Sequence, residues 1–202
     1  MGNATQVITV KSSGSYATVT AWAKGTSGWK SVLSTTAGRV GSNGVVDGAT
    51  RRQNTYTTPS GTYTLTEGFG VEAGGTNMPY TRLNSSHWWV EDPESKYYNS
   101  MHSASGVDFP LTESGDRGSE HLIDHPTQYA KALVINFNRW PATPGRGAGL
   151  PSRQRGRVDR RLRVGAARHD GPDHGMDSAG GASSDRHRVI RLPPGAAGPA
   201  RV

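Results

Sequence analysis

The stretch ALVINFNRWPATPGRGAGLPSRQRGRVDRRLR, residues 132–163, contains the point at which the character of the sequence changes. All five Trp, seven Tyr and three Phe residues precede Gly149, as does every lysine. The tail from Leu150 holds eleven Arg against five Asp and so carries most of the net charge of +7. Residues 150–202 lack the apolar surface that offsets chain entropy, which predicts a disordered Arg/Gly/Pro-rich tail. Residues 5–149 are predicted to form one folded domain.

The composition limits the chemistry of the chain. It contains no cysteine, which excludes disulfides, thiolate metal sites and a thiol nucleophile in this polypeptide. No apolar run approaches the length of a membrane span, so none is expected. The first five residues lack the basic and apolar regions of a signal peptide. Either the chain is cytosolic or its leader is not in this sequence.

The first third of the chain reads as antiparallel β-structure. Gln6–Val10 and Tyr16–Trp22 are β-branched runs around a Gly/Ser-rich turn, which is a hairpin pattern. Trp29–Thr35 is predicted as a third strand of this meander. In Thr57–Leu65, the spacing of a proline and a glycine, Pro59 and Gly61, predicts a tight turn before another strand.

The second half of the folded part has weaker patterns. Residues 78–98 are rich in aromatic side chains among polar ones. Pro126–Ala132 suits a short helix with proline at its start, and it would lead into a strand at Leu133–Phe137. The fold class predicted for residues 5–149 is therefore mostly β, with one or two short helices.

The segment Tyr98-Asn-Ser-Met-His102 provides candidate cleft residues, and Tyr98, Asn99 and His102 are the predicted substrate-binding side chains. A lone histidine is more often a surface or packing residue than a ligand-binding one. The adjacent Trp88 and Trp89 indicate core plus rim more than a glycan platform, although neighbouring strand residues point to opposite faces, so one of them is expected to face outward.

Other motifs favour structural roles. His121 and His125 lie four apart beside Glu120, but the order differs from the His-Glu-x-x-His zinc pattern and Pro126 interrupts a helix there. Gly145-x-Gly-x-Gly149 lacks the spacing of a dinucleotide loop and is predicted to be a turn. No Gly-x-Ser-x-Gly elbow offers a serine nucleophile. Neither a metal nor a cofactor is therefore expected.

Four short stretches in order resemble one enzyme family: Leu33–Gly38, Thr57–Tyr63, Val134–Asn138 and Gly145–Gly149. The chain resembles the catalytic domain of L,D-transpeptidases in its secreted actinobacterial form, whose Thr-Pro-x-Gly-x-aromatic signature corresponds to residues 58–63. The resemblance covers residues 5–149 and implies a β-rich sandwich in the cell envelope or outside the cell. It also implies a strand ending in His and a (Ser or Thr)-x-Gly-Cys motif directly after Gly149, and the chain contains neither.

A reading frame shifted by one base can encode both motifs. When the tail is read one base later with GC-rich codons and one or two others, Leu150–Arg155 becomes Phe-Leu-His-Val-Asn-Gly, and Val158–Asp170 begins Ser-Thr-Ala-Gly-Cys. Some of these codons are chosen, but Met176 followed by Asp177 must read Trp. Ser184–Val189 can read Arg-Ile-Val-Ile-Gly and a stop, which is typical of a terminal β-strand. The tail is therefore predicted to be out of frame.

The resemblance implies nucleophilic acyl transfer, in which a Cys thiolate activated by His attacks an amide. It implies peptidoglycan stem peptides as partners, with a terminal D-Ala leaving and two diamino-acid residues becoming cross-linked. Because the Cys and its His are absent, the chain is expected to be inactive. The alternatives are a non-catalytic peptidoglycan-binding β module and a nucleic-acid-binding Arg-rich tail. The tail has no aromatic residues for base stacking, so no nucleic acid is expected as a partner.

Overall fold

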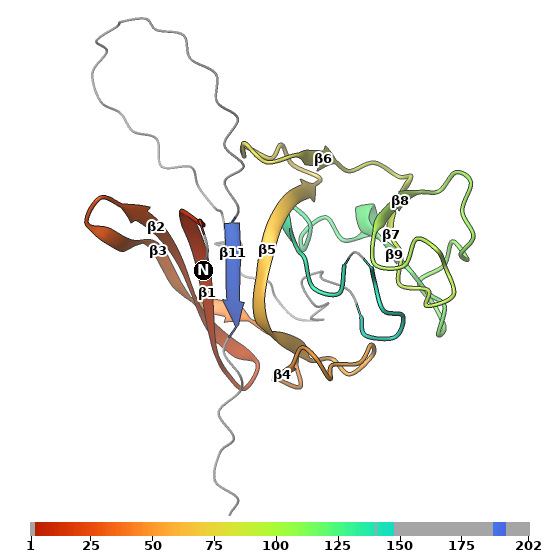
Figure 1. Ribbon diagram of the computed structural model, residues 1–202. Helices are drawn as coiled ribbons and strands as arrows, with labels where there is room; N and C mark the ends of the chain where they lie inside the picture. The colour runs from red at the N-terminus through yellow and green to blue at the C-terminus, as the bar shows by residue number, and fades with distance from the viewer. Residues whose placement is uncertain (1–2, 140, 148–187, 193–202) are drawn as a thin grey trace, which may run out of the picture.

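The computed structural model describes residues 3–139 and 141–147 and the backbone of residues 188–192. Most regular elements in this part of the chain are β-strands, which confirms the predicted mostly β fold class (Figure 1). The shifted-frame His and Cys positions lie outside the described residues, as does the rest of the tail apart from residues 188–192. Within the described ranges, no helix is both long and apolar enough to cross a membrane.

The N-terminal meander is confirmed. Strands β1 (Gln6–Ser13), β2 (Tyr16–Gly25) and β3 (Gly28–Arg39) pair in antiparallel order, and each runs farther than its β-branched run. Ser13 pairs with Tyr16 across a two-residue turn. The first residue of that turn has a φ of 57°, and it is a glycine, which adopts this conformation without steric cost.

The tight turn predicted at Pro59 and Gly61 is wrong, because both residues lie within one long strand, β5 (Thr58–Gly70). Pro59 is tolerated near the start of the strand, beside the three-residue strand β4 (Val45–Asp47). Gly61 has a φ of 151°, and a Cβ there would collide with the ring of Tyr63. The glycine thus admits an aromatic ring against the backbone instead of reversing the chain.

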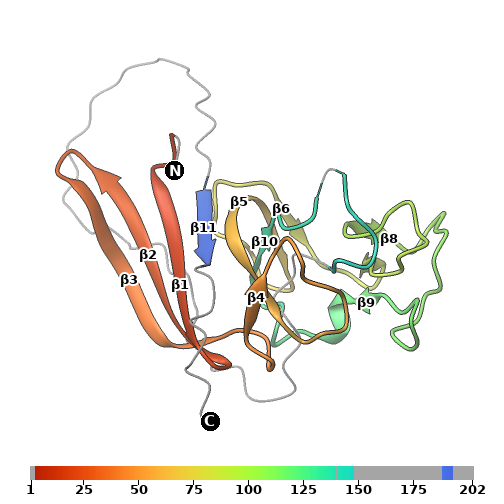
Figure 2. The same cartoon turned by 60° about the horizontal axis from the view of Figure 1, so that its bottom comes forward.

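The large sheet has the order β10-β5-β11-β1-β2-β3, with β4 and β6 (Tyr80–Arg82) paired along β5 (Figures 1 and 2). Strand β10 (Ala132–Ile135) confirms most of the strand predicted at Leu133–Phe137. Strand β11 (Arg188–Leu192) belongs to the tail, and it lies between β1 and β5. At these five residues the structure differs from the expectation of a tail without structure, because two strand edges are available for them to pair with.

A second, small sheet stands at the loop-rich end of the molecule (Figures 1 and 2). It consists of β7 (His87–Trp89) between β8 (Met101–Ser103) and β9 (Glu120–His121). Strands of two or three residues supply few main-chain hydrogen bonds. Side chains therefore have to hold this end together, and most of the fully buried ones belong to it or pack against it.

The helix predicted at Pro126–Ala132 is wrong. These residues form turns up to Ala132, where β10 begins, and the regular helix beside them is a single 3-10 turn, Leu122–Asp124. The carbonyl groups of Tyr129 and Ala130 accept hydrogen bonds from the chain that leaves β5, at 2.9 and 3.0 Å. The pairing of Tyr129 and Ala130 with that chain extends the β5–β10 contact toward the N-terminus of β10, and this tertiary contact overrides the local helix preference.

The main core joins the two sheets. Phe69 of β5 and Trp89 of β7 stack with ring centroids 6.2 Å apart, and both are fully buried. The expectation that one of the paired tryptophans faces outward is wrong, because Trp88 is only 7% exposed. Its ring packs in a second cluster with Val90 and Phe109, on the other face of β7. The ring of His121 stacks on it, with the two ring centroids 4.4 Å apart. Loops on both faces of β7 bury both rings.

Candidate functional site: a cleft beside the Gly-rich loop

A cleft of about 470 Å³ opens between two loops. One wall is Ser95–Ser100, which connects β7 to β8. The other is the chain that follows β10, represented by Arg139, Pro141, Ala142 and Pro144. The second wall leads directly to the Gly-rich loop, which begins at Gly145 and is described up to Gly147. Two predicted binding residues, Tyr98 and Asn99, line the cleft.

Asn99 fastens the two walls together. Its Nδ2 donates hydrogen bonds to the carbonyl oxygens of Phe137 at 3.0 Å and Asn138 at 2.5 Å, and the residue is 2% exposed. Its backbone has a φ of 60°, a left-handed conformation that asparagine tolerates better than most residues. Asn99 therefore sets the width of the cleft through its amide and its backbone.

Tyr98 anchors the Gly-rich loop. Its hydroxyl donates to Oε1 of Gln53 at 2.6 Å and accepts from the amide of Gly147 at 2.8 Å. Burial raises the pKa of Tyr98, with the hydrogen bond from Gly147 acting in the opposite direction. The hydroxyl is therefore neutral near pH 7, and both hydrogen bonds that it makes are internal. Tyr98 acts in this cleft through the ring and through the loop that it positions.

His102 does not line the cleft. It lies on β8, its Nδ1 is 2.7 Å from the carbonyl oxygen of Ser103, and its ring packs 3.8 Å from that of Tyr97. Tyr97 is a lining residue, and the ammonium group of Lys96 lies 4.9 Å from the centre of its ring. His102 thus supports the cleft from behind through Tyr97, which is the packing role that a lone histidine more often has.

The charge of the cleft is positive. The described lining residues include Lys96 and Arg139 and no acidic side chain. Arg139 is largely buried, forms a 2.6 Å ion pair with Glu67, and lies 5.5 Å from the ring centre of Trp89. Lys96 is exposed at the opposite wall. The pairing with Glu67 fixes Arg139 in place and offsets part of its charge, whereas Lys96 projects an ammonium group that an anionic ligand can approach.

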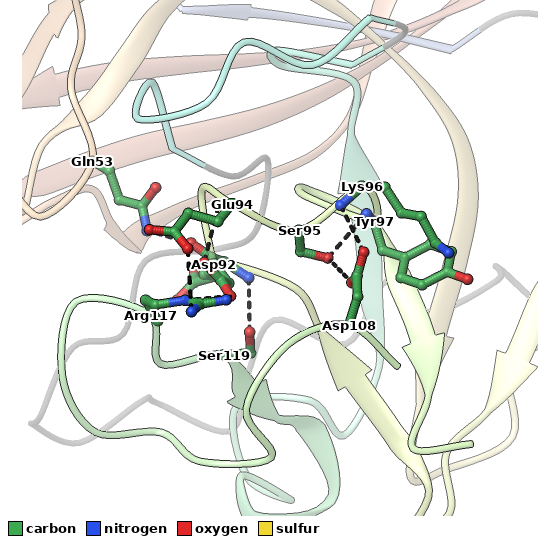
Figure 3. Close-up of polar contacts among 10 residues, drawn as sticks. Gln53, Asp92, Glu94, Ser95, Lys96, Tyr97, Asp108, Arg117 and Ser119 are labelled. Carbon is green, nitrogen blue, oxygen red and sulfur yellow. Dashed lines mark hydrogen bonds and ion pairs between the residues drawn. The ribbon is translucent and has the colours of Figure 1, made fainter. Parts of the chain in front are cut away.

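A polar brace holds the Ser95–Ser100 wall from below (Figure 3). The hydroxyl of Ser95 donates to Asp108 at 2.5 Å, and that hydrogen bond is the main reason why the pKa of Asp108 is lowered. Asp92 is fully buried, accepts the amide of Glu94, and forms a 2.9 Å ion pair with Arg117. The wall therefore begins at a loop whose position is fixed by two carboxylates.

Sequence reasoning missed the partners that complete this site. The main-chain N–H of Gln53 donates a hydrogen bond to the carbonyl oxygen of Gly145 at 2.7 Å. Nη1 of Arg51 donates one to the carbonyl oxygen of Arg146 at 2.8 Å. The side-chain amide of Asn138 holds the start of the same loop, because its Nδ2 donates to the carbonyl oxygen of Thr143 and its Oδ1 accepts from the main-chain N–H of Thr143. The predicted turn is confirmed within the described part of the loop, up to Gly147. No local signal identifies Arg51 or Gln53, because they meet the loop from more than ninety positions earlier.

The histidine pair lies away from the cleft lining. Nδ1 of His121 is 2.8 Å from Asp124 and its Nε2 is 2.8 Å from the carbonyl oxygen of Ser85, while Nε2 of His125 is 2.9 Å from Glu113. In the described part of the chain, no three His, Cys, Asp or Glu side chains form a group that could hold a metal ion. The positions of these rings are explained by hydrogen bonds to the neighbouring loops.

Comparison with family models, with curated proteins and with solved structures gives no match.

Proposed function

We propose that the chain is an L,D-transpeptidase-like protein of the cell envelope whose described part binds peptidoglycan stem peptides without transferring them. One observation carries the proposal: a positively charged cleft lies between the loop of Tyr98 and Asn99 and the chain that leads into the Gly-rich loop. A stem tetrapeptide ends in a D-alanine carboxylate, and an exposed ammonium group at the rim of a cleft attracts such an end.

We expect this chain to bind a stem peptide without carrying out acyl transfer. Acyl transfer in this family proceeds through a thioester, and the chain has no cysteine to form one. Removing a nucleophile together with its base eliminates nearly all rate and leaves the binding energy of the scaffold. The chain is thus expected to retain a stem peptide at the cleft and to release it unchanged.

Intact-mass spectrometry after exposure to a carbapenem, which traps the cysteine of this family, tests the missing nucleophile. We expect no adduct on this chain. A chain read one base later from Leu150 and ending near the position of Val189 should gain one carbapenem mass and cross-link stem peptides. An adduct on the unaltered chain, or none on a folded restored chain, would overturn the assignment of the nucleophile.

Sedimentation with purified sacculi tests binding separately from chemistry. Lys96→Ala removes the exposed charge at the cleft, and Lys24→Ala removes a comparable exposed charge on β2. We expect Lys96→Ala to weaken binding about threefold to fivefold, as for loss of one exposed ion pair, and Lys24→Ala to leave it unchanged. Equal loss in both variants, or stronger binding to DNA than to sacculi at matched salt, would favour a general basic surface over the cleft.

The alternative of a peptidoglycan-binding β module without an enzymatic origin shares the same cleft. The two readings differ in the tail, because only a transpeptidase ancestry predicts His and Cys codons in the shifted frame. Sequencing the coding DNA across the codons of Gly149 and Leu150 separates them. Codons that read Phe-Leu-His after the shift support the transpeptidase, and codons incompatible with that reading support the binding module.

A further inference from the structure

Strands β1 and β5 flank a single-strand gap in the large sheet. β11 fills it, running parallel to β1 from Gln6↔Arg188 to Thr9↔Arg191 and antiparallel to β5 from Leu65↔Arg188 to Gly61↔Leu192 (Figure 1). At the usual strand spacing, the two walls of this gap are about 10 Å apart. That separation admits one extended chain.

The outer edges of both walls are already used. β2 pairs along β1, and β10 pairs along β5. The inner edges of β1 and β5 consequently present main-chain donors and acceptors that β11 satisfies. Backbone groups left unpaired inside a sheet are costly, so these two edges favour an extended occupant of almost any sequence.

Apolar side chains from both walls form the floor of the gap. Leu65 of β5 is 2% exposed, and Ile8 and Val10 of β1 pack against the same cluster, together with Tyr63. Because β1 and β5 are not themselves neighbours in the sheet, these side chains meet beneath the strand that separates them. Main-chain edges above a shared apolar floor are the features by which proteins bind extended peptides as an added strand.

We propose that the gap between β1 and β5 is a strand-binding groove, which takes a short extended peptide through main-chain hydrogen bonds and which residues 188–192 of the same chain occupy. The sequence connecting the body to this strand, residues 148–187, is long enough for the strand to act as a tethered ligand. Because the strand is covalently attached, its pairing is intramolecular, and an added peptide of the same sequence competes with it at a concentration comparable to the effective concentration of the attached strand.

Disulfide trapping in the full chain tests occupancy, since the chain has no cysteine of its own. Thr62 and Arg191 are paired Cα positions, whereas Thr36 is an exposed residue on β3, three strands from β11. We expect Thr62→Cys with Arg191→Cys to form an intramolecular disulfide under mild oxidation. Thr36→Cys with Arg191→Cys should not, because strand spacing puts it about 14 Å away, beyond disulfide reach. Equal yields, or a disulfide between isotopically distinct copies, would overturn the proposal.

A peptide of residues 186–194 with cysteine in place of Arg191 tests the groove from outside. Ile190→Pro in the full chain removes a donor that the resident strand needs. With peptide at about a tenth of the effective concentration, we expect roughly tenfold more labelling of Thr62→Cys in the Ile190→Pro background than without it. Labelling of Thr36→Cys at the same rate, or no gain from Ile190→Pro in a chain with unchanged circular dichroism, would contradict the groove. The first experiment decides the question if Ile190→Pro unfolds the chain.

Discussion

The N-terminal meander and the loop region around the cleft are stabilised in different ways. In the meander, strands of eight to twelve residues pair along their length, and large apolar side chains such as Val32 and Leu33 remain 65% and 45% exposed. In the loop region, strands have two or three residues, and Trp89, Asp92 and Asn99 are 0–2% exposed. Main-chain pairing therefore stabilises the meander, whereas individual buried side chains stabilise the loop region. Single substitutions should lower the free energy of unfolding far more in the loop region than in the meander.

The largest contrast is expected between Trp89→Ala and Leu33→Ala. Trp89 is fully buried against Phe69, and its removal should lower the free energy of unfolding by about 3–5 kcal/mol. Leu33 is an exposed residue on β3, and its truncation should change the same quantity by less than about 0.5 kcal/mol. Urea unfolding measures both. Similar losses would show that the meander depends on side-chain burial as well.

Asn99 should give the next largest effect, and two substitutions separate its two contributions. Asn99→Ala removes both amide hydrogen bonds and puts a residue that tolerates a φ of 60° less well than asparagine at this position, for an expected loss of about 2–3 kcal/mol. Asn99→Gly removes the amide alone, so it should cost about 1 kcal/mol less. Urea unfolding of the two variants measures the difference. Equal costs would mean that the backbone conformation stores no strain.

Gly147 and Gly145 offer a matched pair in the loop behind the cleft. Both have positive φ, but a Cβ at Gly147 would overlap Nη1 of Arg51, whereas a Cβ at Gly145 meets open space. Gly145→Ala should cost about 1 kcal/mol for its conformation, and Gly147→Ala should cost at least about 1 kcal/mol more. Thermal unfolding measures the order of the two. A reversed order would contradict the docking of this loop on Arg51.

The smallest effect concerns the pH dependence of the His121–Asp124 pair. Burial alone lowers the pKa of His121, but the hydrogen bonds to the Ser85 carbonyl and the Asp124 carboxylate outweigh it, so the folded pKa is raised above 6.5. Stability from this pair is then fully present below about pH 6.5, the unfolded value, and is lost as pH rises through the folded pKa. The Tm advantage of the wild type over Asp124→Asn should therefore shrink between pH 6 and pH 8. A constant difference would exclude linkage to His121.

The difference between the meander and the loop region also explains which elements could be predicted from the sequence. The meander was predictable because β-branched runs around a Gly/Ser turn specify a ladder locally. The strand at Leu133–Phe137 was predictable for similar reasons. The turn at Pro59 and the helix at Pro126–Ala132 were predicted wrongly, because partners distant in the sequence override local preference.

The candidate site follows the same division. Tyr98, Asn99 and His102 were predicted together from one short segment, and the first two lie in the lining of the cleft. His102 was placed with them by proximity in the sequence, but β8 directs the chain away from the cleft lining. The hydrogen bonds from Tyr98 to Gln53 and from Gly147 to Tyr98 join residues 45 and 49 positions apart, so no local pattern identifies them.

The most direct measurement of the central claim is an NMR titration of the isotopically labelled chain with a soluble peptidoglycan stem tetrapeptide. We expect the largest amide shift changes at Lys96, Tyr98 and Asn99 and in the loop that ends at Gly147. The meander should be unaffected, and the tetrapeptide should be recovered with its terminal D-alanine intact. Shift changes confined to the meander, or release of D-alanine, would contradict the proposal that the cleft binds stem peptides without transferring them.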